Sequence, residues 1–118
     1  MSATLSTHVL DTALGQPAAG LVVELRALDL PNATVKQFVT NADGRVSDGL
    51  LNADESIPGR YELLFKAGDY WRAQGRAEAL DDPLFLDEIP IRFGLAATGH
   101  HHVPLLLSPF SYSTYRGS

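Results

Sequence analysis

The chain of 118 residues contains no cysteine. Without cysteine there is no disulfide framework, no thiolate nucleophile and no cysteine-ligated zinc site. The sequence also has no apolar run near the ~20 residues that a membrane helix needs, so we expect no membrane partner. Clusters of basic residues are missing too. The formal net charge is −5, which argues against nucleic acid as a partner.

The start of the chain shows no secretion signal. Residues 1–15 have neither a basic segment nor a long apolar stretch, and the sequence therefore predicts a cytoplasmic protein. A length of 118 residues suits one domain with its own core, and a hydrophobic content of 45% argues against disorder. We expect residues 1–118 to form a single domain.

Short apolar or alternating runs recur along the chain and are separated by turn residues such as Gly, Pro, Asn and Asp. The runs cover residues 5–10, 21–28, 35–40, 61–66, 89–95, 102–107 and 111–115. This spacing is typical of a small all-β sandwich or barrel. One segment departs from it, because residues 68–75 offer Asp69 as an N-cap and close on a glycine, which predicts a short helix.

Three consecutive histidines, His100 to His102, run directly into the apolar segment VPLLL. Side chains alternate between the two faces of a strand, so His100 and His102 share a face with residues 104 and 106, and His101 lies on the other face. The segment VPLLL itself does not alternate, which indicates that both of its faces are covered. We expect a second copy of the chain to cover one of them, and a hairpin to follow at Ser108-Pro109.

Three stretches of the sequence resemble the transthyretin-like 5-hydroxyisourate hydrolases. They are LSTHVLDTALGQPAAGL at residues 5–21, FKAGDYW at 65–71 and HHHVPLLLSPFSYSTYRGS at 100–118, of which the closing tetrapeptide YRGS is the most specific. The resemblance implies an all-β, transthyretin-like two-sheet sandwich of Greek-key type, with about eight strands and one short helix. It also implies a homotetramer, built as a dimer of dimers, with active sites in a channel between the dimers.

The same resemblance implies a reaction and a set of site residues. The reaction is hydrolytic opening of the six-membered ring of 5-hydroxyisourate to 2-oxo-4-hydroxy-4-carboxy-5-ureidoimidazoline, in the degradation of urate, with no cofactor and no metal. By position in the motifs, the catalytic residues are His8, Arg45, His102 and Ser118. His8, Arg45 and Tyr115 are implied to bind the substrate.

The chemistry of these side chains suits that reaction. A histidine with an ordinary pKa of about 6.5 can activate water and later protonate a leaving nitrogen near neutral pH. The guanidinium of Arg45 offers paired donors that match adjacent carbonyl groups. The sequence leaves open whether His8 or His102 activates the water. We expect Gly117 to let the backbone approach the site more closely than any side chain would allow.

Two other readings of these residues remain at this point. His100, His102 and His8 together offer three nitrogen ligands of the kind that bind zinc. The same fold also suits a carrier of aromatic small molecules without catalytic activity, as in transthyretin. A carrier needs an apolar channel without a base or an oxyanion donor, whereas this sequence has His8, Arg45 and His102.

Overall fold

The computed structural model describes residues 3–32 and 35–117. These residues form ten strand segments, one α-helix and one 3-10 turn. In chain order they are β1 (Ala3–Ser6), β2 (Val9–Asp11), β3 (Gln16–Pro17), β4 (Val22–Ala27), β5 (Lys36–Val39), β6 (Gly59–Lys66), α1 (Ala67–Ala73), the 3-10 turn (Ala77–Ala79), β7 (Glu88–Leu95), β8 (Gly99–His102), β9 (Leu105–Ser108) and β10 (Ser111–Thr114).

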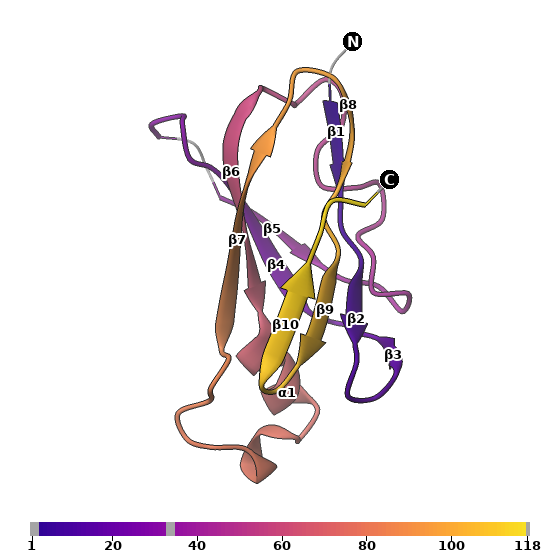
Figure 1. The fold of residues 1–118 in the computed structure, drawn as a ribbon, viewed down its shortest axis with the longest axis vertical. Helices are drawn as coiled ribbons and strands as arrows, with labels where there is room; N and C mark the ends of the chain where they lie inside the picture. The colour runs from indigo at the N-terminus through magenta and orange to yellow at the C-terminus, as the bar shows by residue number, and fades with distance from the viewer. Residues whose placement is uncertain (1–2, 33–34, 118) are drawn as a thin grey trace.

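Two four-stranded sheets face each other as a sandwich (Figure 1). One sheet has the strand order β10-β9-β2-β3 and the other has the order β5-β4-β6-β7. The parallel pair β1–β8 extends the first sheet towards the end of the molecule that carries the N-terminus (Figure 1). The predicted all-β sandwich is confirmed, and so is the hairpin after Ser108, since β9 and β10 pair antiparallel.

The first sheet is interrupted at one level across two neighbouring strands. β1 and β2 are separated by Thr7 and His8, while β8 and β9 are separated by Val103 and Pro104. The two pairs keep the same offset across the break, because Ser6 is opposite His102 and Val9 is opposite Leu105. The buried Thr7 hydroxyl donates to the Val103 carbonyl at 2.7 Å, and Val103 N–H donates to the Ser6 carbonyl at 2.9 Å. The break is therefore hydrogen-bonded and holds its flanking histidines in place.

The core lies between the sheets and follows the two-residue alternation of the strands. In β1 and β2 the side chains of Leu5 and Val9 are at most 1% exposed, and in β9 those of Leu105 and Leu107 are fully buried. The predicted division of the histidines is confirmed, because His101 is only 4% exposed, whereas His100 is exposed and His102 is half-buried. The outer face of the sheet thus carries His100 and His102.

The single α-helix of the described residues follows β6 directly. Its buried residues Ala67, Tyr70 and Trp71 have the spacing of one helical face, and that face packs against the core. The expectation that Asp69 caps the helix is wrong. The helix begins earlier, the N-cap position is Lys66, and no side chain caps it, so Asp69 lies within the first turn.

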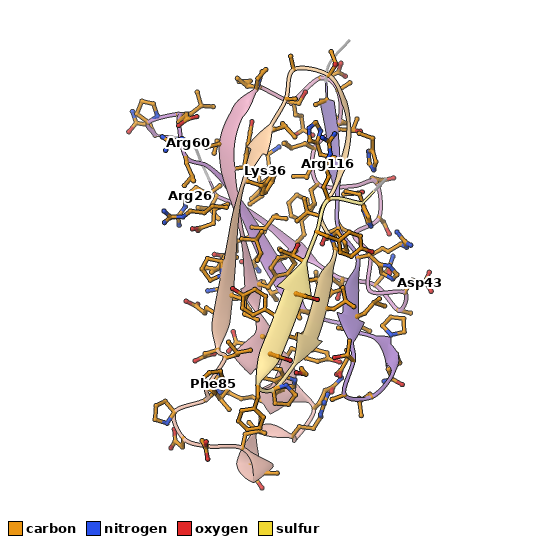
Figure 2. All side chains as sticks on the ribbon, viewed as in Figure 1. Arg26, Lys36, Asp43, Arg60, Phe85 and Arg116 are labelled. Atoms are coloured by element: carbon orange, nitrogen blue, oxygen red, sulfur yellow. The ribbon has the colours of Figure 1, made fainter. Side chains whose placement is uncertain are left out.

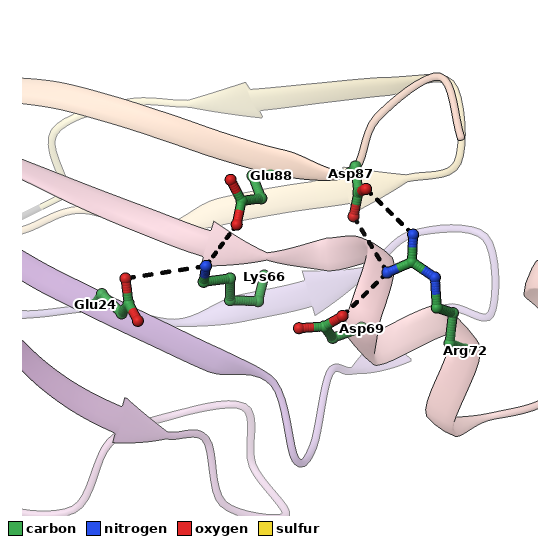
Figure 3. A network of polar contacts seen from close by, with 6 residues as sticks. All are labelled: Glu24, Lys66, Asp69, Arg72, Asp87 and Glu88. Carbon is green, nitrogen blue, oxygen red and sulfur yellow. Dashed lines mark hydrogen bonds and ion pairs between the residues drawn. The ribbon is translucent and has the colours of Figure 1, made fainter. Parts of the chain in front are cut away.

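Ion pairs tie the helix start to the neighbouring strands (Figure 3). Lys66 bridges Glu88 and Glu24, and Arg72 bridges Asp87 and Asp69. The Arg72 pairs of this network are exposed and contribute little to stability, whereas Lys66 and Glu24 are half-buried. In the ranges that the structure describes, no helix has both the length and the apolar character required to cross a membrane.

Candidate functional site

Arg45 is held beside His8 by the tight loop that follows β5. The Asn41 side-chain oxygen accepts hydrogen bonds from the N–H groups of Asp43 and Arg45, at 2.9 and 3.1 Å. Gly44 has a φ of +75°, and a Cβ there would lie 2.3 Å from the Val9 carbonyl oxygen. Only glycine therefore allows this approach, which brings Arg45 into a backbone bridge with His8. Figure 2 shows Asp43 on the flank of the molecule beside β2.

The tautomer of His8 follows from its hydrogen bond. Its Nε2 lies 2.9 Å from the carbonyl oxygen of Asp43. A carbonyl oxygen only accepts, so Nε2 carries the proton of the neutral ring and Nδ1 has the free lone pair. The His8 side chain is half-buried on the same outer face as His102.

His102 lies at the break in β8–β9. Its Nδ1 is 2.8 Å from the Ser6 hydroxyl oxygen, which leaves Nε2 as the nitrogen available to a reactant. Burial lowers the pKa of His102, and it is lowered further by the positive charge of Arg45 and by His100 and His8 when these are protonated. His102 is consequently neutral at neutral pH and able to accept a proton. The backbone bridge between His8 and Arg45, and the bond from Leu105 N–H to the His8 carbonyl, bring these two residues to the level of His102 at the break.

The C-terminal segment returns to His102 after β10. Gly117 N–H donates to the His102 carbonyl at 2.8 Å. A Cβ on Gly117 would lie only 2.5 Å from Cδ2 of the His102 ring, so the expected close approach of this glycine is confirmed. Ser118, which the sequence motif makes a catalytic residue, lies outside the described residues.

Tyr115 and Arg116 lie at the edge of the sandwich, on the side of His101 rather than on that of His102. Both are exposed, and they line a cavity of about 250 Å³ together with Phe93 and His101. Figure 2 shows Arg116 towards the end of the sandwich that carries β1 and β8. The structure thus brings His8, Arg45, His102 and Gly117 together, whereas it places Tyr115 in a cavity beside His101, on the other face of β8.

The histidines do not form a metal site in the part of the chain that the structure describes, where no three His, Asp or Glu side chains cluster as metal ligands would. Both ring nitrogens of His100 are bonded instead to hydroxyl groups, Nδ1 to Thr4 at 2.6 Å and Nε2 to Ser6 at 2.9 Å.

The sequence reasoning missed Thr4 and Ser6 as members of the site. A signal for them existed. Thr4, Ser6 and His8 follow one another at every second position, so they share the outer strand face with His8. Hydroxyl side chains are common on the exposed faces of strands, so this spacing does not single out Thr4 and Ser6. Only the pairing of β1 with β8 shows that they contact the histidines.

The assembled side chains supply what acyl transfer to water requires. His102 offers a neutral nitrogen as a base, Arg45 offers paired cationic donors for a developing oxyanion, and His8 offers a second nitrogen of known tautomer. The site lies on an open sheet face, where half-buried Leu10 and Leu106 adjoin the polar groups.

The chain is similar to known proteins of one family. The family model described as HIUase/Transthyretin family matches residues 5–117. A 5-hydroxyisourate hydrolase of Mesorhizobium japonicum is 57% identical over 115 residues, which cover 97% of this chain and 91% of the relative.

Solved structures of related proteins have a similar fold. A 5-hydroxyisourate hydrolase of Klebsiella pneumoniae superposes with a TM-score of 0.80 at 35% identity, covering 98% of this chain and 94% of that one. An (S)-allantoin synthase reaches a TM-score of 0.89 at 44% identity, but this chain corresponds to only 44% of its length. Sea bream transthyretin in complex with thyroxine has a TM-score of 0.79 at 27% identity, covering 97% and 94% of the two chains.

Proposed function

The chain belongs to the HIUase/transthyretin family, and on that premise we propose that it hydrolyses 5-hydroxyisourate to 2-oxo-4-hydroxy-4-carboxy-5-ureidoimidazoline. The observation that carries the proposal is that the backbone bridges His8–Arg45 and His102–Gly117 meet at the break in the first sheet. The relative from Mesorhizobium japonicum and the enzyme of known structure from Klebsiella pneumoniae, both named as hydrolases of this compound, support it.

In the proposed reaction His102 is the general base. Its Nε2 takes a proton from water while the water oxygen attacks an acyl carbon of the six-membered ring. The Arg45 guanidinium stabilises the oxyanion that forms. The carbon–nitrogen bond then breaks, and the proton held on His102 passes to the leaving nitrogen. Water is the only co-reactant, so the reaction needs no cofactor.

The remaining site residues are assigned to substrate binding and orientation. The Nδ1 of His8 is assigned as the acceptor for a ring N–H of the substrate, since its Nε2–H donates to the Asp43 carbonyl. Ser118 follows Gly117 and is assigned a catalytic role from the family motif alone. Tyr115 is assigned to the wall of the substrate site on the same basis.

We propose that the active form is a homotetramer, a dimer of dimers. β7 and β10 each end a sheet, so their outer backbone groups are open to pairing with a second copy. The exposed rings of Phe85 and Phe110 lie next to these edges, with centroids 6.1 Å apart. A site on an open face also needs a cover to exclude water. Light scattering that gave the mass of a single chain at micromolar concentration would overturn the tetramer.

The decisive experiment uses freshly generated 5-hydroxyisourate. Its ultraviolet absorbance is followed with the protein, without it, and with His102→Asn at the same concentration. We expect the wild-type protein to accelerate the decay and the variant to do so far less. The same rate with and without wild-type protein would refute the hydrolase.

The alternative is a carrier of aromatic small molecules. The specific observation behind it is the likeness in fold to sea bream transthyretin, a protein solved with thyroxine bound. A carrier would bind such an aromatic compound stoichiometrically and leave 5-hydroxyisourate intact, so the absorbance experiment also separates these two functions.

A further inference from the structure

Four side chains form one hydrogen-bonded chain across the parallel pair β1–β8, on the outer face of the sheet. Thr4 lies opposite His100 and Ser6 lies opposite His102. The Thr4 hydroxyl is 2.6 Å from His100 Nδ1, and the Ser6 hydroxyl is 2.9 Å from His100 Nε2. The same Ser6 oxygen is 2.8 Å from His102 Nδ1. Ser6 therefore bridges the two histidines, whose rings are close to parallel, 16° apart, with centroids separated by 6.4 Å.

This chain of contacts permits two opposite directions of hydrogen bonding. In the first, Thr4 donates to His100 Nδ1, His100 Nε2–H donates to Ser6, and Ser6 donates to His102 Nδ1. His102 then carries its proton on Nε2. In the second, His102 Nδ1–H donates to Ser6, Ser6 donates to His100 Nε2, and His100 Nδ1–H donates to Thr4. His102 Nε2 then has a free lone pair. A hydroxyl can hold either direction because it both donates and accepts.

We propose that Ser6 is a positioning residue that sets the tautomer of His102 and relays a proton between His102 Nδ1 and His100 Nε2. The relay rests on the proposed function, in which His102 is the base. In the second direction His102 presents the lone pair that the attack of water requires. In the first direction it presents a donor at the same atom.

Every proton that moves in the relay is accounted for. When His102 Nε2 takes the proton of water, the Nδ1 proton passes to the Ser6 oxygen and the Ser6 hydroxyl proton passes to His100 Nε2. Ser6 ends as a neutral hydroxyl, His102 ends neutral, and the positive charge rests on His100. When His102 Nε2 then gives its proton to the leaving nitrogen, the reverse transfers return a proton from His100 Nε2 through Ser6 to His102 Nδ1. No other reactant is needed.

The surroundings of the two histidines favour this direction of charge transfer. His102 is half-buried, and its ring lies near that of His100. Burial and the charge of Arg45 lower its pKa. His100 is exposed to solvent, and both of its nitrogens remain bonded to hydroxyls. Water therefore solvates a cation at His100 better than at His102.

The test compares Ser6→Ala with Ser6→Thr, which restores a hydroxyl and suits a strand. Ser108→Ala is the matched control, because Ser108 is also a half-buried serine of this sheet, bonded to Ser111 rather than to a histidine. The first readout is the ¹⁵N chemical shifts of the imidazole nitrogens against pH, which report tautomer and charge without substrate. The second is the pH profile of kcat/KM for 5-hydroxyisourate.

We expect Ser6→Ala to change the tautomer of His102 and to uncouple its titration from that of His100. It should lower kcat by roughly 10–100-fold, as the loss of a partner that orients an active-site imidazole does, and leave KM nearly unchanged. Ser6→Thr should restore both readouts, and Ser108→Ala should match the wild type. Because His100 is exposed, His100→Gln offers a second test on a variant that retains the core. It should lower kcat as Ser6→Ala does.

Unchanged imidazole shifts in Ser6→Ala, or a failure of Ser6→Thr to restore them, would overturn the relay. A full rate in His100→Gln would overturn it as well. A wild-type protein without hydrolase activity would refute the proposed function instead, and the ¹⁵N titration would still decide whether Ser6 couples the two histidines.

Discussion

Gly117→Ala tests how closely the C-terminal segment must approach His102, the proposed base. The added Cβ would lie 2.5 Å from Cδ2 of His102 and 3.2 Å from its Cβ and Cγ. Carbon atoms in contact are normally about 3.5 Å apart or more, so either the ring or the segment must move by about 1 Å. A misplacement of that size in an active site costs on the order of 10²-fold in rate.

The same substitution should leave the fold almost unchanged. Residues 115 and 116 are exposed, and the segment buries little apolar surface, so the free energy of unfolding should change by less than about 1 kcal/mol. The assay is steady-state hydrolysis of 5-hydroxyisourate, with unfolding in urea measured in parallel. Gly94→Ala is the control, since a Cβ there meets no atom within 4 Å. A Gly117→Ala protein that is as stable and as active as the wild type would refute the close contact.

Three further predictions concern the histidines, the arginine and the buried carboxylate. Replacing His102 or His8 with asparagine should lower kcat by roughly 10²–10⁴-fold with the fold retained, and full activity in both variants would mean that water is activated elsewhere. Arg45→Lys should also reduce kcat/KM, because an ammonium cannot reproduce the paired donors of a guanidinium, and an unaltered value would exclude that pairing. Asp11→Asn should lower the free energy of unfolding by about 3 kcal/mol or more in urea titrations, because the Asp11 carboxylate is 1% exposed and accepts from Arg76 at 2.6 Å.

A last prediction concerns acid stability. Burial and the surrounding positive charges hold the pKa of folded His102 below its ordinary value of 6.5. The unfolded chain therefore binds a proton more readily than the folded one in this range. The contribution to stability is complete above pH 6.5 and is lost as the pH falls through the folded pKa. Urea unfolding at pH 7.5 and pH 5 should show a smaller loss in His102→Asn than in the wild type. Equal losses would contradict the pKa shift.

The strand pattern and the faces of the strands could be predicted from the sequence, because they depend on local alternation. The burial of His101 and the outward position of His102 follow from parity alone. The close approach of residue 117 to the site could also be predicted, because a glycine has no Cβ to keep the backbone away. Asp43 and Gly44 are residue types that favour turns, but the contact of this loop with His8 joins distant segments and has no local signal.

Other features depend on pairings between distant segments and could not be predicted. Nothing local indicates that β1 pairs in parallel with β8, yet this pairing gives Ser6 and Thr4 their histidine partners. The helix start was misplaced for a related reason. Asp69 is a residue type that favours the N-cap position. The helix instead begins at Ala67, because Ala67 and Trp71 are buried against the core.

The interruption of the first sheet explains how this sandwich accommodates a catalytic site. An unbroken ladder uses all its backbone groups and presents a regular face of side chains. Here the break lies between Ser6 and Val9 on one strand and between His102 and Leu105 on its neighbour, with the same offset on both sides. His8 turns towards the Asp43 loop at that level, and Gly117 returns to His102. A binding protein on the same fold requires only an apolar surface such as that of Leu10 and Leu106. The hydrolysis that we propose also requires the polar groups that lie at the break.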